Sequence, residues 1–450
     1  MSAVQQPPLP PPEAVAPGAA ATELKSRGLG RPAPRSRAQT RSTPAFLRQW
    51  NVILLILVAA FAVVGSIAAL VMRSASDTTA ANTAPALIGV QDLFASVAEA
   101  NAAATAAFLS TSTTGAEDRV NRNLYLDAIR RASGQTEEVS AIIGPDEEAH
   151  DALKEIGFSL NTYSGQIEAA RVANANDLPN ADTQLREALR IIQVDVADSV
   201  ATVTARGQSQ LESERTTGRL LAWLSIGLGV VTVLALLRVQ LGLYRRTNRV
   251  FNPLLVLATV LVATVLGYLT VGPSTRALAL DSASTGGYDA IATTSELQTT
   301  AFDLQSLLSL EILDSGTGRT AELEPLFTDV AAGIDRLLAG ADSDRERAAS
   351  QALLVRWTRY EDAARSIDAL ARAGDQAGAV ALYQGEGLAT FNGLNTGIES
   401  VLSDNRSQFI DGVDRASQAV STTPFLTIIL PVLAALAILL AIQRRLGEYR

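Results

Sequence analysis

Four long apolar runs divide the chain. They cover residues 52–72, 219–240, 253–272 and 424–443, and their uninterrupted apolar stretches carry no charged side chain. A helix needs about 20 residues to cross a ~30 Å hydrocarbon core at 1.5 Å per residue. The pattern therefore predicts four transmembrane helices, and residues 219–272 form a hairpin of two of them.

The polar segments between the runs, residues 73–218 and 273–423, show helical rather than strand patterning. Turn signals in the first segment lie at 110–118, with a capping box from Thr114 to Glu117, and at 144–148 and 174–182. They predict helices over roughly 84–112, 117–142, 146–174 and 179–218. The second segment repeats the plan, with turns at 314–318, 339–346 and 372–378. A capping box from Ser343 to Glu346 belongs to the middle turn.

The third helix of each segment has an apolar seam at heptad spacing, which is typical of helix bundles. The seam residues are Leu153, Ile156, Leu160, Tyr163, Ile167 and Ala170 in the first helix, and Leu353, Trp357, Tyr360, Ala364, Ile367 and Ala371 in the second. The sequence predicts an all-α integral membrane protein with four transmembrane helices and two extracytoplasmic four-helix bundles.

A short motif closes both halves of the chain. The sequence LGLYR at 241–245 recurs as LGEYR at 446–450, 205 residues later. Tyrosine and arginine at the end of a span also serve as interfacial anchors, and this simpler explanation accounts for their position. The recurrence, together with the repeated order of elements, predicts a tandem duplication of one span–bundle–span unit.

Charge fixes the predicted orientation. The tail 1–50, the loop 241–252 and the terminus 444–450 are rich in arginine, whereas residues 74–218 and 273–423 each hold eleven more acids than bases. Short basic loops stay in the cytoplasm. We expect a multi-pass plasma-membrane protein whose N- and C-termini are both cytoplasmic. Asn252 and Pro253 suit the N-cap and first turn of the third span.

The N-terminal tail is proline-rich and basic. Nine of the 17 prolines lie in residues 1–45, a composition that predicts disorder. A solvated leader that helps to set topology and a docking tail for a cytoplasmic partner both fit this composition.

The residue inventory argues against enzymatic chemistry. The chain has no cysteine and one histidine, His150, and it contains no phosphate-loop, kinase, metalloprotease or dinucleotide-binding motif. Spans without ionisable residues lack the usual mark of an ion or substrate path. We expect no catalytic residue, no cofactor, no metal site and no nucleic-acid partner.

Two sets of residues are candidates for partner contacts. In an up-and-down bundle whose first and fourth helices continue into spans, the first and third turns lie far from the bilayer. The candidate outer docking residues are Thr114, Glu117, Asp118, Asp177, Asn180, Asp314, Arg319 and Asp375. The candidate cytoplasmic output residues are Tyr244, Arg245, Arg246, Arg249, Arg445, Tyr449 and Arg450. Contact with anionic lipid is the alternative role for the second set.

The predicted chain has tandem helical sensor bundles, each flanked by two spans, and no output domain follows them. This architecture resembles that of a known family. With the third-helix stretch YSGQIEAARVANANDLPNADTQLREA and bases that are almost all arginine, the chain resembles the GlnX type of actinobacterial four-span proteins. Such a protein stands between GlnH, a glutamate- and aspartate-binding lipoprotein, and the soluble serine/threonine kinase PknG. The resemblance implies a relay that reports extracellular acidic amino acids to a cytoplasmic kinase.

Two other functions are open on the sequence. In one, the bundles bind a small ligand directly, as in a chemoreceptor, and act with a separate histidine kinase. In the other, the chain is a structural protein of the cell envelope. The oligomeric state is also open, with a homodimer as one alternative.

Overall fold

The computed structural model describes residues 43–116, 118–247, 252–281, 287–314, 320–421 and 423–447. The chain is helical almost throughout this part, which contains no strand. The α-helices are α1 (Thr43–Thr78), α2 (Ala84–Thr114), α3 (Arg119–Ile142), α4 (Glu147–Ala175), α5 (Ala181–Arg190), α6 (Ala197–Thr247), α7 (Pro253–Asp281), α8 (Asp289–Leu313), α9 (Thr320–Ala339), α10 (Asp344–Arg372), α11 (Gln376–Leu382), α12 (Leu388–Ser421) and α13 (Thr423–Gly447). The predicted all-α class is confirmed.

The first span continues into the first bundle helix without a break. A π-helical turn, η1 (Thr79–Thr83), joins α1 to α2, and the backbone stays right-handed helical on both sides of it. Pro85 follows directly, and a proline inside a helix leaves the carbonyl four residues earlier without its usual N–H partner. A π-turn beside the proline accommodates this local mismatch. Residues 43–114 therefore form one long rod.

A second rod runs from the outer tip back through the membrane-spanning region. It consists of α5, a π-helical turn η2 (Ile191–Val196) and α6, which alone is 51 residues long. The equivalent helix of the second half contains α11, a π-helical turn η4 (Tyr383–Gly387) and α12, and it is separated from α13 by residue 422. Both halves thus interrupt their fourth bundle helix with a π-turn near its start.

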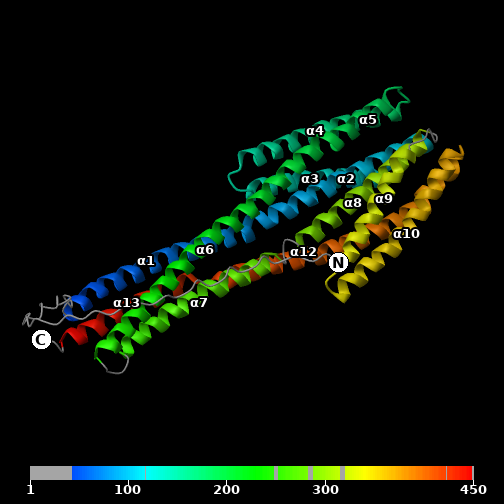
Figure 1. Cartoon of the computed structure of the whole chain (residues 1–450). Helices are drawn as coiled ribbons and strands as arrows, with labels where there is room; N and C mark the ends of the chain where they lie inside the picture. The colour runs from blue at the N-terminus through cyan, green and yellow to red at the C-terminus, as the bar shows by residue number, and fades with distance from the viewer. Residues whose placement is uncertain are drawn as a thin grey trace, which may run out of the picture.

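Four helices in the described part of the chain are long and apolar enough to cross a membrane. The candidate spans lie at Arg48–Thr114, Trp223–Arg245, Pro253–Val271 and Phe425–Arg444. They form a ring in which α1 packs against α6 and α13, and α7 closes the other side against the same two helices. Figure 1 shows them gathered at one end of an elongated molecule, with the remaining helices at the other end.

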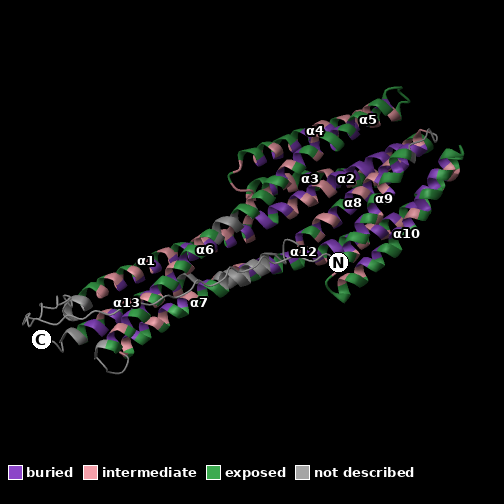
Figure 2. Ribbon diagram, viewed as in Figure 1, coloured by how far each residue is buried: buried purple, intermediate pink, exposed green. Residues whose placement is uncertain are grey.

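The outward faces of the spans are apolar. Figure 2 shows many exposed residues along this end of the molecule, and they include Ile56, Val63, Leu234, Val260 and Leu433. Side chains such as Leu54, Phe61 and Val262 fill the interior of the ring instead. A continuous exposed apolar surface of this kind fits a hydrocarbon environment rather than water.

The outer helices form two bundles whose predicted seams are buried. The first consists of α2, α3, α4 and the outer part of α5–α6, and the second of α8, α9, α10 and α11–α12. All twelve heptad residues named above lie in the cores of their bundles. The largest of them, Trp357, Tyr163 and Tyr360, are at most 1% exposed. The heptad prediction is confirmed in both third helices.

The two bundles stand side by side and share a seam between α2 and α8. Alanines at 98, 102 and 106 of α2 belong to the core of the second bundle, and Leu310 of α8 belongs to the core of the first. Small side chains let two helix backbones approach closely, so the alanine-rich face of α2 is suited to this contact. Asn101 Nδ2 donates to Ser306 Oγ across the seam at 3.3 Å.

One predicted cap is wrong. Thr114 is the last residue of α2, where its hydroxyl donates to the Ser110 carbonyl at 2.7 Å, and α3 begins only at Arg119. The N-cap of α3 is Asp118, whose carboxylate accepts from the N–H groups of Val120 and Asn121. An aspartate one residue before the helix satisfies these orphan donors directly, so Asp118 and not Thr114 is the N-cap. The Ser343–Glu346 capping box is present as predicted.

Candidate functional sites

The candidate outer docking residues that the structure describes lie at the end of the molecule opposite the spans; they are Thr114, Asp118, Asp177, Asn180, Asp314 and Asp375. Figure 1 places the α4–α5 turn and the end of α10 there. Asp118 and Asp375 are helix caps, and Asp375 accepts from the Gly378 N–H at 2.9 Å. Their carboxylates therefore have local structural roles. Glu117 and Arg319 lie outside the described residues.

The α4–α5 turn has the most unusual backbone among the described residues. Asp177 has a φ of 51°, and it is the one described residue other than glycine with positive φ. Aspartate tolerates this left-handed conformation better than most residues because its short side chain bonds locally. Asn180 precedes α5 but makes no side-chain capping bond. Neither side chain completes a helix, so both are available at the tip.

Contacts that the sequence analysis missed tie the tips together. Asn174 at the end of α4 donates to the Phe108 carbonyl at 3.0 Å and accepts from Ser112 at 2.8 Å, so it joins α4 to α2. Arg186 of the first bundle pairs with Asp314 of the second at 3.3 Å. The two bundles are therefore in contact at their tips through an ion pair. Residues so far apart in the sequence leave no local sequence pattern from which their pairing could be predicted.

The ends of the spans that lie away from the bundles meet at one place. They are the beginning of α1, the end of α6, the beginning of α7 and the end of α13 (Figure 1). Tyr244 and Arg245 lie in the last turns of α6 and are exposed. Arg246 and Arg445 lie in the final turns of α6 and α13, whereas Arg249, Tyr449 and Arg450 fall outside the described residues.

Amide side chains connect these inner ends. Gln240 Nε2 of α6 donates to the Leu255 carbonyl at 2.9 Å and to Thr259 Oγ1 at 2.8 Å, both on α7. The Asn252 side chain accepts from the Leu254 N–H at 3.2 Å, as predicted for a cap, and donates to the Ala441 carbonyl of α13 at 3.3 Å. Interhelical bonds of this type stabilise membrane helix contacts. They join α6, α7 and α13 to one another at the span ends that lie away from the bundles.

A cleft of about 190 Å³ opens at the seam between the bundles, and we call it the seam cleft. Its polar lining residues are Asn101, Arg186, Arg190, Gln193, Asp303, Ser306 and Glu322. The first four belong to the first half of the chain and the last three to the second. Burial raises the pKa of the Asp303 carboxyl to about 6.

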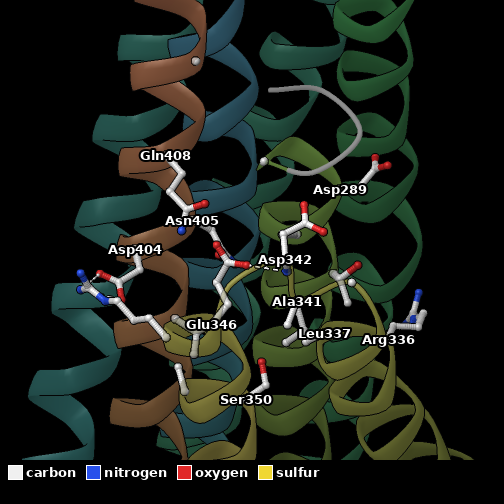
Figure 3. Close-up of a pocket in the computed structure, with 18 of the residues that line it drawn as sticks. Asp289, Arg336, Leu337, Ala341, Asp342, Glu346, Ser350, Asp404, Asn405 and Gln408 are labelled. Atoms are coloured by element: carbon white, nitrogen blue, oxygen red, sulfur yellow. Dashed lines mark hydrogen bonds and ion pairs between the residues drawn. The ribbon is translucent and has the colours of Figure 1, made fainter. Parts of the chain in front are cut away.

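A larger cavity of about 400 Å³ lies at the base of the second bundle, between the α9–α10 turn, the start of α8 and the inner half of α12. Figure 3 shows Asp342 and Glu346 beside each other, and Glu346 accepts the Asp342 N–H at 2.9 Å. Arg345 is turned to Asp404 at 3.0 Å. Glu346 thus serves the start of α10, and Asp404 serves an ion pair. In the described part of the chain no cluster of histidine, aspartate and glutamate has an arrangement that would hold a metal ion.

Four apolar helices of membrane-spanning length, joined to two helical bundles at one end, define a multi-pass membrane protein. Residues 75–216 match the family model described as an actinobacterial sensor domain. This range begins in the last turn of α1 and covers the first bundle. No curated protein and no solved structure matches the chain. The protein is therefore a multi-pass membrane protein, and the match over residues 75–216 indicates a role in sensing.

Proposed function

We propose that the protein is a non-enzymatic transmembrane relay. In this proposal an extracellular solute-binding lipoprotein, loaded with glutamate or aspartate, docks on the bundle tips, and a cytoplasmic serine/threonine kinase reads the inner ends. The observation that carries the proposal is the continuity of the two rods, 43–114 and 181–247, from the outer tips to the inner ends. Rigid helices transmit small translations and rotations over their full length.

The sensor-domain match supports the input side of the relay. The ligand and both partners come from the resemblance to the GlnX type and are part of the proposal. Arginines at 245, 246 and 249 favour a cytoplasmic location for the α6–α7 connection, because short basic loops are retained inside. Tyr244 and Arg245 then face the compartment where a kinase is present, and arginine binds acidic surfaces through two parallel hydrogen bonds.

The outer docking surface is tested at the α4–α5 turn, where side chains are free of capping roles. The double variant Asp177→Asn, Asp182→Lys removes negative charge at the tip while asparagine keeps the left-handed conformation of residue 177. We expect capture of the lipoprotein by the full chain in membranes to weaken about tenfold, since steering and rim charges are lost.

The matched control is Glu137→Gln, Glu138→Lys, which changes charge by the same amount on an exposed face of α3, well below the tip. Its capture of the lipoprotein should equal that of the unmodified chain. If both double variants capture the lipoprotein equally well, the α4–α5 turn is not its docking surface.

A further inference from the structure

The seam cleft is built from both halves of the chain. Helices α2 and α5 and the turn η2 supply its first wall, and α8 and the start of α9 supply the second. Gln193 in the lining belongs to the π-helical turn η2. Single π-turns inside α-helices recur at functional sites, because they displace side chains from the regular helical register. A molecule bound here contacts both halves at once.

The two walls carry opposite charges. Arg186 and Arg190 lie on α5, one turn apart, and their guanidinium groups are exposed at the opening. Asp303 lies on α8, half-buried, and makes no ion pair in the described part of the chain. A carboxylate that is desolvated and unpaired is costly to the folded protein, so a cation placed beside it is favourable.

An unsatisfied acceptor belongs to another residue of the same lining. Asn101 is 1% exposed and Ser306 is 3% exposed, and they bond to each other through Asn101 Nδ2. Asn101 Oδ1 is buried and accepts no hydrogen bond. A buried polar atom without a partner costs about 1–3 kcal/mol and calls for an explanation. A ligand N–H group would supply the missing donor.

The size of the cleft limits what it accepts. Its volume of about 190 Å³ equals roughly six waters at ~30 Å³ each. This is room for one small molecule and not for a peptide. The arginines already pair with Asp314, Glu187 and Asp195 at 3.0 to 3.4 Å, so an anionic group of a ligand would share their guanidinium donors with these acids.

We propose that the seam cleft binds a free amino acid in its zwitterionic form. The ammonium group lies at Asp303 and the Asn101 amide oxygen, and the α-carboxylate lies at Arg186 and Arg190. Binding joins α5 to α8, so an amino acid in the cleft holds the two bundles together. The proposal goes beyond the relay, because it needs neither an outer nor an inner partner.

The experiment uses the full chain in lipid nanodiscs with no other protein present. Saturation-transfer NMR is recorded with L-alanine, with propionate, which lacks the ammonium group, and with ethylamine, which lacks the carboxylate. A panel of the other common amino acids identifies the strongest binder. We expect L-alanine to bind, and propionate and ethylamine to bind at least tenfold more weakly than alanine, because each loses one charged contact.

Two variants test the two ends of the ligand. Asp303→Asn and Arg186→Gln should each weaken binding of the strongest amino acid by tenfold or more. The matched controls are Asp329→Asn on the exposed face of α9 and Arg359→Gln on the exposed face of α10, and both should bind as the unmodified chain does. Circular dichroism confirms that every variant keeps its helical content.

Absence of binding by every amino acid would overturn the proposal, and so would ethylamine binding as tightly as alanine. Binding that survives Asp303→Asn and Arg186→Gln unchanged would place the amino acid elsewhere. Capture of the lipoprotein at the tips is measured separately. A negative result for amino-acid binding in the seam cleft therefore does not contradict the relay, and a negative result for lipoprotein capture does not contradict amino-acid binding.

Discussion

Asp303 illustrates how a single residue of the seam works against the stability of the fold. Its carboxyl is half-buried on α8 with no ion pair among the described residues, and burial raises its pKa from an ordinary value near 3.8 to about 6. The folded chain therefore holds this proton more tightly than the unfolded chain does. The associated stability is fully present below about pH 3.8 and is lost as the pH rises through 6.

The raised pKa of the Asp303 carboxyl predicts that Asp303→Asn stabilises the protein at neutral pH. We expect a gain of about 1 to 3 kcal/mol at pH 7.5 and almost none at pH 3, because aspartate is then mostly protonated in both states. Thermal unfolding of the full chain in detergent, followed by circular dichroism at the two pH values, measures the difference. Equal melting temperatures for both chains at pH 7.5 would contradict a desolvation penalty at this position.

At the scale of single residues, a helix cap could be predicted from sequence where both partners of the capping bond lie close together in the chain. Ser343 and Glu346 form their capping box because the two partners are three residues apart and compete with no better cap. Thr114 and Glu117 have the same spacing, yet Asp118 lies closer to the helix start and takes the N–H groups. Asp303, Asn101 and Gln193 give no local signal, since the cleft exists only after the two halves pack.

At the scale of the elements, hydropathy and heptad spacing were sufficient to locate the spans and the seams of α4 and α10. The π-turns η1, η2 and η4 were not predicted, because their hydrogen bonds differ from those of an α-helix by one residue and leave the apolar pattern nearly intact. The α2–α8 contact was also not predicted. An alanine-rich face suits the inside of a bundle and a close helix pair equally well.

The ring of spans predicts cross-links within one chain. The Ser66 hydroxyl of α1 donates to the Thr427 carbonyl of α13 at 3.5 Å, and the chain contains no native cysteine. Oxidation of a Ser66→Cys, Thr427→Cys variant in membranes should give a disulfide within the monomer, identified by mass spectrometry of the monomer band. The control pair Ile67→Cys, Leu433→Cys faces outward and should not cross-link within one chain. Disulfides found between chains alone would contradict the ring.

At the scale of the whole molecule, the two halves behave as one unit. Besides the α2–α8 seam, Arg186 pairs with Asp314 near the tips, and Arg406 of α12 pairs with Asp92 of α2 nearer the membrane. The halves share a core, a cleft and a ring of spans. The separations along the sequence are 128 and 314 residues, and no local pattern predicts such pairs.

The recurring element order and the repeat of LGLYR as LGEYR support the proposed duplication. The facing pair Asn101 and Ser306 has the same separation of 205 residues as the two motifs. This agreement is expected if the halves are related by an approximate two-fold axis along α2 and α8, since equivalent residues then oppose each other. In the proposed relay, α6 and α13 would then be equivalent helices, because the motifs LGLYR and LGEYR occupy matching places in the sequence.

The central claim is that one chain contacts a solute-binding lipoprotein at the tips and a kinase at the inner ends. Photoreactive amino acids at Asp177 and at Tyr244, used one at a time in native membranes, test it most directly through mass spectrometry of the captured proteins. The account predicts a solute-binding lipoprotein from position 177 and a serine/threonine kinase from position 244, and neither from the lipid-facing control position Val260. Capture of the same products from positions 244 and 260, or of no lipoprotein from position 177, would contradict it.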